Sequence, residues 1–295
     1  MTCMKAFFKK QIKRLGHHLV VGHLNDRFEA YASSREAQLV LSLAYQNQAS
    51  DGKVLPSFDQ ATVRAFSQTN EDGILLLITS VLGRGNGRIV EIGCGNGEES
   101  NSANLLVNHG WHGWLFDGSK EGIVAADRFF QNCRDTRHHP PLIRQAWITR
   151  KNINQLLEDA GVPSEIDVFS LDIDGMDYWV WEALTFVRPR IVVLEYNNII
   201  PADLSITVPY EDSFSVQTQG YMGASLRALV DLSKKKGYRL IGCNKYGYNA
   251  FFIREDDGLP HFPDVSVEAC LDFPHCRNDQ RSVFEPIRDM PWESV

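Results

Sequence analysis

The feature that most constrains the fold is a glycine-rich turn that directly follows an apolar segment at residues 89–92. A short, mostly apolar segment of this kind is typical of a buried parallel strand. The turn places Gly93, Gly95 and Gly97 immediately after it. Glycine lets the backbone turn sharply and lie directly against a ligand, because no Cβ blocks the approach. The segment therefore predicts the ligand-binding turn of an open α/β sheet.

The spacing of the glycines limits which ligand such a turn can hold. A dinucleotide fingerprint needs a third glycine three residues after the second, and that position is Glu98. Glu98 and Glu99 open the next helix, whose positive end suits them, but they would repel a pyrophosphate bound at the same amides. The turn therefore predicts a neutral or cationic ligand.

S-adenosylmethionine fits that requirement, because it carries a sulfonium charge, an adenosine and no phosphate. Its ribose diol needs an acidic acceptor at the end of the next strand, and Asp117 closes the apolar run 114–116 about twenty residues after the turn. Glu91 is expected to face the methionine end. The alternative is that the glycines form only a tight turn and that Asp117 only caps a helix.

Composition narrows the partners. The formal net charge of -7 argues against general nucleic-acid binding, which relies on clustered Lys and Arg, so we expect a small-molecule acceptor. Six cysteines without a C-x-x-C pair, and no long apolar run, predict a cytoplasmic protein without a transmembrane segment. Residues 5–15 combine an apolar stripe with several lysines, so this segment is either a helix packed on the core or a membrane-surface helix.

The apolar pattern divides the chain into three parts. Residues 1–60 are predicted to form an N-terminal helical cap, with a helix over 35–45 and a polar loop over 46–57. Residues 61–255 alternate strand and helix patterns, which is typical of a parallel sheet covered on both faces. Residues 256–295 are predicted to be a tail packed on the core. Strands are expected near 88–93, 112–117, 141–146, 167–172, 190–196, 238–243 and 248–254.

The last two strands are joined by a short loop suited to a hairpin. The prediction is therefore an α/β fold with a Rossmann-like seven-stranded sheet, in which five parallel strands are followed by an antiparallel hairpin. This is the layout of class I methyltransferases.

Acidic side chains follow the fourth and fifth strands, where open parallel sheets bind ligands. Asp172 and Asp174 flank one residue and would point the same way in an extended chain, with Glu195 and then Asn197 on the neighbouring strand. Clustered carboxylates repel unless they are protonated or paired with a cation. Either one carboxylate removes a hydroxyl proton, or the group binds a divalent cation such as Mg²⁺. A helix-capping role is the third alternative.

Residues 197–222 have no clear periodicity and are predicted to form an unstructured lid or binding loop. Tyr196, Tyr210 and Tyr221 are its candidate contacts to an acceptor. Aromatic side chains beside a sheet are more often part of the core.

With these residues in view, residues 66–254 resemble the FkbM-like branch of S-adenosylmethionine-dependent methyltransferases. The resemblance depends on FSQTNEDGI (66–74), VEIGCGNGEES (90–100), WLFDGS (114–119), FSLDIDGMDYWVWEAL (169–184), RIVVLEYN (190–197) and the segment 221–254. The branch commonly has I-D-V-E-G where this chain has L-D-I-D-G, so the carboxylate of Asp174 is one carbon shorter.

The resemblance implies roles for residues around the predicted pocket. Glu91 and the three turn glycines would hold the amino acid end of the cofactor, Asp117 would hold its ribose, and Gly118 would also contact the cofactor. The adenine would lie at Ala146 and Trp147, Gln68 and Glu71 would border the pocket, and Asp172 would reach the cofactor.

These observations predict a methyltransferase that uses S-adenosylmethionine to O-methylate a hydroxylated metabolite of the sugar or polyketide type, with or without a metal ion. Two alternatives stay open. One is a cofactor-binding or interaction module without catalysis. The other is a metal-dependent hydrolase that uses Asp172, Asp174 and Glu195, although the sequence offers no phosphate cradle and no activated nucleophile.

Overall fold

The computed structural model describes residues 34–295. The predicted surface helix at 5–15 and the first part of the predicted cap lie outside these residues. Residues 34–50 are helical, so the helix predicted over 35–45 continues into the stretch that we expected to be a loop. It ends just before Gly52, whose φ of 67° suits glycine and interrupts the helix.

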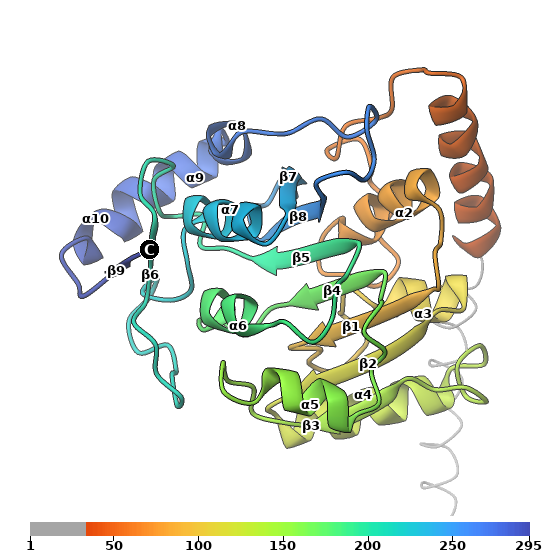
Figure 1. Cartoon of the computed structure of the whole chain (residues 1–295), viewed down its shortest axis with the longest axis horizontal. Coiled ribbons are helices and arrows are strands. Elements are labelled where there is room, and N and C mark those ends of the chain that lie inside the picture. The colour runs from red at the N-terminus through yellow and green to blue at the C-terminus, as the bar shows by residue number, and fades with distance from the viewer. Residues whose placement is uncertain (1–33) are drawn as a thin grey trace, which may run out of the picture.

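A seven-stranded sheet forms the centre of the molecule (Figure 1), in the order β3-β2-β1-β4-β5-β8-β7. The first five strands pair in parallel, and β8 pairs antiparallel with both β5 and β7. This confirms the predicted sheet. Its strands are β1 Arg88–Ile92, β2 His112–Asp117, β3 Leu142–Gln145, β4 Val168–Leu171, β5 Ile191–Glu195, β7 Tyr238–Cys243 and β8 Asn249–Arg254.

Successive side chains of each central strand pack into two separate hydrophobic cores, one on each face of the sheet. In β5, for example, Ile191 and Val193 belong to one core, whereas Val192 and Leu194 belong to the other. The first core is covered by α2 Glu71–Leu82, α3 Ala103–His109 and α4 Lys120–Asn132. The second is covered by α5 Ile153–Asp159, α6 Asp177–Ala183 and α7 Leu226–Lys235.

Local sequence fixes where two of these helices begin. Ser119 precedes α4 and its hydroxyl accepts a hydrogen bond from the amide of Gly122, and Ser225 does the same for Ala228 in α7. Lys234 and Lys235 lie in the last turn of α7, where the helix dipole favours cations. Both helices therefore begin with a serine cap, and α7 also ends with cations that suit its dipole.

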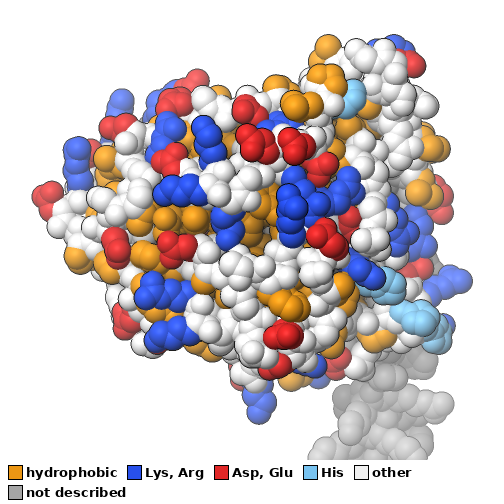
Figure 2. All heavy atoms as spheres, viewed as in Figure 1, with side chains coloured by type: hydrophobic (Ala, Val, Ile, Leu, Met, Phe, Trp, Pro, Cys, Tyr) orange, Lys and Arg blue, Asp and Glu red, His pale blue; other side chains and the backbone are white. Residues whose placement is uncertain are grey.

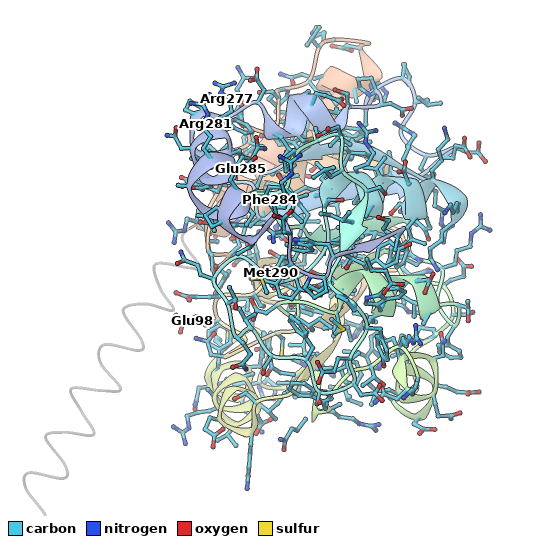
Figure 3. All side chains as sticks on the ribbon, turned by 90° about the vertical axis from the view of Figure 1, so that its left-hand side faces the viewer. Glu98, Arg277, Arg281, Phe284, Glu285 and Met290 are labelled. Carbon is cyan, nitrogen blue, oxygen red and sulfur yellow. The ribbon has the colours of Figure 1, made fainter. Side chains whose placement is uncertain are left out.

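The segment 197–222 is not unstructured, contrary to our prediction. It contains β6 Ile206–Thr207, which pairs antiparallel with β9 Glu293–Ser294 near the end of the tail. The tail also forms α8 Val267–Leu271, α9 Pro274–Asp279, η1 Gln280–Phe284 and α10 Glu285–Ile287. Figure 3 shows the last three as one run of helix, with Met290 beyond it. A third, smaller core joins the two segments through Ile199, Ile200, Phe284 and Ile287.

The neighbours of β1 determine where a ligand can bind. The chain leaves β1 for β2 on one side and later returns to β4 on the other, which makes a topological switch point. Ligands of such sheets bind in the crevice beyond the carboxyl ends of the strands at this point.

On the face shown in Figure 2, Lys and Arg side chains are interspersed with Asp and Glu. No helix within residues 34–295 is long and apolar enough to cross a membrane.

Candidate functional site

A cavity of about 940 Å³ opens beyond the carboxyl ends of the strands. That volume lies at the upper end of the range for small-molecule sites. Most of the predicted site residues line it, namely Gln68, Glu71, Glu91, Gly93, Gly95, Asp117, Gly118, Ala146, Trp147, Asp172, Asp174 and Glu195. The structure therefore brings together residues from six separate segments that the sequence analysis selected.

The three glycines of the turn serve different purposes. A Cβ on Gly93 would lie 1.6 Å from the carbonyl oxygen of Asp172, so this glycine lets β1 and β4 approach each other. A Cβ on Gly97 would lie 2.8 Å from the Cβ of Ala126 in α4. Gly95 has no protein atom within 4 Å of that position and borders the cavity. Gly95 is therefore where a ligand can lie against bare backbone.

Asp117 stands at the end of β2 and holds the turn. One carboxylate oxygen accepts from the amide of Gly95 at 2.8 Å, and the other accepts from the amide of Ser119 at 2.7 Å. Asp117 is only half-buried and lines the cavity, so its remaining lone pairs face the open space. A diol placed over Gly95 would meet this carboxylate.

The ring of Trp147 forms a wall beside Asp117. A Cβ on Gly118 would come within 2.9 Å of this ring, so the two residues are already in contact across the cavity edge. The ring nitrogen donates to the carbonyl oxygen of Asp212 at 2.6 Å, although 59% of Trp147 is exposed. Ala146 donates its amide to the carbonyl oxygen of Asp117. This arrangement leaves a flat aromatic surface at the cavity edge, next to Gly118.

We expected Glu91 to face the methionine end of the ligand. It lines the cavity, but its carboxylate also hydrogen-bonds to the protein. Its buried carboxylate accepts from the amides of Asn101 and Ser102 at 2.9 and 3.1 Å and from the Ser102 hydroxyl. Burial raises the pKa of Glu91, and these donors oppose that rise. Glu91 therefore fixes the segment that leads into α3 and presents only part of its surface to the cavity.

Glu71 is also buried and lies in a network of amides at the other end of the cavity. It accepts from the Thr69 hydroxyl and from the Asn244 side chain, both at 2.6 Å, and from the Asn249 side chain at 3.3 Å. Gln68, by contrast, is exposed at the rim. The network ties α2 to the hairpin of β7 and β8.

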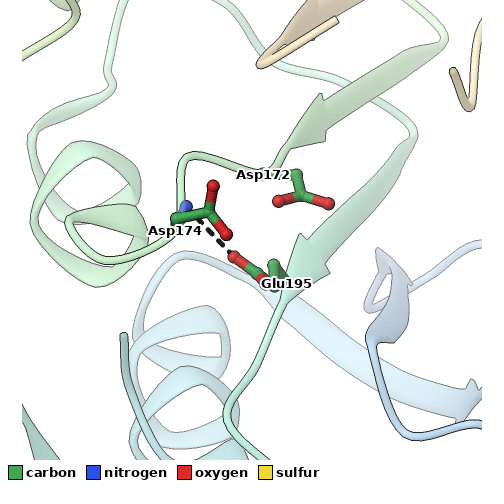
Figure 4. A group of neighbouring side chains, drawn as sticks. All are labelled: Asp172, Asp174 and Glu195. Carbon is green, nitrogen blue, oxygen red and sulfur yellow. Dashed lines mark hydrogen bonds between the residues drawn. The ribbon is translucent and has the colours of Figure 1, made fainter. Parts of the chain in front are cut away.

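Asp172, Asp174 and Glu195 lie together at the ends of β4 and β5 (Figure 4). One carboxylate oxygen from each lies within 4.8 Å of the others. The predicted juxtaposition is present, but not by extended alternation, because β4 ends at Leu171 and Asp174 has a left-handed φ of 54°. The amide of Asp174 donates to Glu195 at 3.2 Å.

The surroundings of Asp172 and Glu195 favour the neutral forms of these two carboxyl groups. Burial, reinforced by Asp177, raises the pKa of Asp172 to about 7, and burial together with Asp172 raises the pKa of Glu195 well above its usual range. Within residues 34–295, no Lys or Arg forms an ion pair with Asp172, Asp174 or Glu195. The group can therefore share protons or accept a cation from outside.

Asp177 is a site residue that the sequence analysis missed. Its buried carboxylate accepts from the amides of Ile173 and Gly175, both at 3.0 Å, and so closes the turn that carries Asp174. Burial raises the pKa of Asp177 to about 6. An acid at the start of a helix, two residues after D-I-D-G, was the available signal.

The aromatic candidates of the loop lie elsewhere than predicted. Tyr196 is in the core, 4% exposed, and its side chain is beside Cys243. Tyr221 donates to the carbonyl oxygen of Pro291, and Tyr210 packs against Arg150, whose guanidinium carbon is 4.0 Å from the ring centre. None of the three is among the residues that line the cavity.

Two other aromatic side chains, Phe214 and Tyr248, line the cavity instead. Asn197 likewise does not line it, because its side-chain amide donates to the carbonyl oxygens of Gly220 and Met222 at 2.8 and 2.9 Å. It anchors the end of the loop, so a direct role in chemistry does not fit its position.

Comparison with known proteins adds little beyond the fold. No protein-family profile and no curated protein matches the chain. Solved structures that are similar include an O-methyltransferase from Bacillus cereus in complex with SAH, at 18% identity over 75% of this chain and 89% of that one, with a TM-score of 0.40.

A putative O-methyltransferase from Klebsiella pneumoniae is 15% identical over 73% and 87% of the two chains, with a TM-score of 0.41. The N-terminal domain of EvdMO1, crystallised in the presence of SAH and D-fucose, is 12% identical over 71% and 94%, with a TM-score of 0.43. Identities and TM-scores this low do not assign the chain to a family.

Proposed function

We propose that this protein transfers a methyl group from S-adenosylmethionine to a hydroxyl group of a small molecule. The observation that carries the proposal is one cavity with two chemically different ends. The glycine turn, with its uncovered backbone, forms the first end together with Asp117 and Trp147. The three carboxyl groups of Asp172, Asp174 and Glu195 form the second end.

The first end suits S-adenosylmethionine. Gly95 leaves space that a Cβ would occupy, Asp117 offers lone pairs to a ribose diol, and Trp147 offers a flat surface to an adenine. Contrary to our prediction, Glu98 and Glu99 do not open a helix, because α3 begins at Ala103. Glu99 still lines the cavity, where its charge would disfavour a pyrophosphate and attract a sulfonium. We assign Asp117 to the ribose, Gly118, Ala146 and Trp147 to the adenine side, and Gly93, Gly95 and Glu91 to the methionine side.

The second end suits proton removal from a hydroxyl group. S-adenosylmethionine, when bound, supplies an electrophilic methyl group on a positively charged sulfur. The protein then has to align the acceptor and take up its proton. Asp172 is the best base of the group, because its pKa of about 7 matches neutral conditions and because Glu195 beside it stays protonated more readily.

A divalent cation is the competing account of the same end. Three carboxylates form an all-oxygen donor set of the kind that Mg²⁺ prefers, and its charge would relieve their mutual repulsion. Methyl transfer that survives exhaustive treatment with EDTA would establish Asp172 as a metal-free base. Activity that is lost with EDTA and restored by Mg²⁺ would establish the cation.

The cofactor half of the proposal is tested by calorimetry with S-adenosylmethionine. Wild-type protein should bind it, and Asp117→Ala should weaken binding by roughly 10- to 100-fold, because a charge-assisted hydrogen bond contributes about 1.5–3 kcal/mol. Asp127→Ala, an exposed acid on α4, is the matched control and should bind as wild type does. Wild-type protein that releases no heat and shows no thermal stabilisation with the cofactor would contradict the proposal.

A further inference from the structure

Among the described residues, the side chains that line the cavity include acidic but no basic ones. Eight acidic side chains line it, and no Lys, Arg or His of the described residues does. Asp212 is paired with Lys151, whereas no ion pair within residues 34–295 neutralises the other seven. The acidic lining residues are Glu71, Glu91, Glu99, Asp117, Asp172, Asp174, Glu195 and Asp212. Any anionic acceptor, such as a phosphate ester or a carboxylic acid, would be repelled.

Asn249 supplies a second and independent observation. It is the first residue of β8 and lies directly opposite Glu195 in the antiparallel register, so both side chains project on the same side of the sheet. It is 6% exposed and lines the cavity. Its side-chain Nδ2 donates to Glu71, but its buried side-chain Oδ1 has no hydrogen-bond partner among the described residues. A buried acceptor without a donor is costly, which points to a donor on the ligand.

The sulfonium of the cofactor is not placed to satisfy this end. Asp117 is on β2 and Asn249 is on β8, four strand spacings apart in the order β2-β1-β4-β5-β8, or about 19 Å at 4.8 Å per strand. With its ribose at Asp117, the sulfonium is one methylene group from the sugar and stays near β1. The α-ammonium of its methionine part would likewise lie on the side assigned above to Gly93, Gly95 and Glu91, so a positive charge beside Glu195 and Asn249 would come from the acceptor.

We propose that the methyl acceptor is a hydroxylated amine, whose ammonium group lies against Glu195, Asp174 and the side-chain oxygen of Asn249. This inference rests on the proposed methyl transfer and names its substrate class. An ammonium has three N–H donors and no acceptor, which matches two carboxylates and one amide oxygen. Phe214 and Tyr248 border the same space, and aromatic faces attract cations.

The same pose leaves Asp172 for the hydroxyl group. The bond between sulfur and the methyl carbon breaks as the oxygen–carbon bond forms, and the hydroxyl proton passes to the carboxylate of Asp172. The ammonium keeps its protons, so its nitrogen has no free lone pair and is not methylated. The expected product is an O-methyl amine.

The inference is tested with two series of hydroxylated probes whose members carry a cationic, a neutral or an anionic substituent. One is dopamine, 4-methylcatechol and 3,4-dihydroxyphenylacetate, and the other is glucosamine, glucose and glucuronate. Binding to SAH-loaded protein is measured by calorimetry, together with the mass of any methylated product. In at least one series the amine should bind about tenfold or more tighter than the neutral member, and the acid should not bind.

Variants identify the residues responsible. Glu195→Gln and Asn249→Ser should each reduce the ratio of amine to neutral affinity toward one, whereas Asp127→Asn, at an exposed position of α4 that does not line the cavity, should leave it unchanged. Thermal melting of each variant shows whether it is folded. Two separate substitutions keep the test usable if one of them unfolds the protein.

Several outcomes would overturn the inference. These are equal or tighter binding of a neutral or acidic member, no binding of either amine at millimolar concentration, or Mg²⁺ alone binding at the cluster and displacing the amine. Wild-type protein that binds SAH but shows no charge preference contradicts only the inference. Protein that binds no SAH contradicts the proposed methyl transfer as well, so the two failures are distinguishable.

Discussion

The surroundings of Asp172 raise the pKa of its carboxyl group, which on the proposed function suits it for proton transfer. Its backbone carbonyl contacts the glycine turn, its amide donates to Ile92, and its carboxyl group faces Glu195. Burial and the nearby carboxylates raise its pKa to about 7, and no described cation offsets this effect. The same environment that makes Asp172 a base at neutral pH leaves like charges close together.

The pH dependence of methyl transfer follows from this pKa. Only the ionised carboxylate accepts a proton, so kcat/KM should rise as the pH passes upward through about 7 and level off above it. Asp172→Asn should lower kcat by roughly 10²- to 10⁴-fold and remove the pH-dependent step. Calorimetry with SAH is the control for cofactor binding. An Asp172→Asn enzyme with an unchanged pH profile would exclude Asp172 as the base.

Glu195 should make the unliganded protein less stable at alkaline pH. Its folded-state pKa is raised above the unfolded value, so ionisation disfavours the folded state as the pH rises above about 4.5. Glu195→Gln should therefore increase the free energy of unfolding by about 1–2 kcal/mol at pH 8 and change it little at pH 4. Urea titrations at the two pH values measure this. A destabilised variant at pH 8 would contradict the expected direction.

At the scale of the element, different glycines of the five-residue turn after β1 serve internal packing and access of a ligand to the backbone. Gly93 is required because the carbonyl oxygen of Asp172 occupies the space of a Cβ, whereas Gly95 has open space there. Both have positive φ values, 85° and 54°, which glycine adopts without strain.

Alanine substitutions should resolve the two roles. Gly93→Ala should destabilise the fold by more than about 3 kcal/mol, because a backbone clash adds to backbone strain. Gly95→Ala should cost only about 1 kcal/mol of stability but weaken S-adenosylmethionine binding about tenfold or more, because the new methyl group occupies the cavity edge. Urea unfolding and calorimetry give the two numbers. Equal stability losses in both variants would show that the turn is not divided in this way.

The sequence predicted the sheet and much of the site because these features have local signals. Apolar runs gave the central strands to within a residue or two of their observed ends, and the strand ends carried Asp117, Asp172 and Glu195. Tyr196 was placed wrongly although a signal existed, since it follows Glu195 in an extended chain and must point to the opposite face. Phe214 had no such signal, because its position depends on the fold of the loop.

At the scale of the whole molecule, the loop over the cavity is part of a larger unit with the tail. β6 pairs with β9, the hydroxyl of Ser205 donates to the carbonyl oxygen of Val295, and Trp292 packs edge-on against Tyr221 at 4.7 Å between ring centres. β6 and β9 have two residues each and lie far apart in the sequence. Strands this short show no apolar periodicity, so the sequence could not reveal this unit.

Loosening the tail should loosen the loop. Trp292→Ala removes contacts to Tyr221 and Phe284, so amide hydrogen exchange within residues 206–222 should accelerate and KM for the acceptor should rise several-fold. On the proposed function, S-adenosylmethionine affinity should change less than this KM, because Gly95 and Asp117 lie outside the loop and Trp147 contacts the loop through the carbonyl oxygen of Asp212. Asp289→Ala, an exposed tail substitution, is the control. Unchanged exchange in the loop would show that the tail does not hold it.

The pairing of β6 with β9 also imposes an order of events during translation. The ribosome makes residues 206–207 long before residues 293–294, so a nascent chain can complete the central sheet while β6 still has no partner. The loop that borders the proposed acceptor end should therefore reach its final position last, after the sheet that carries the proposed cofactor end has formed.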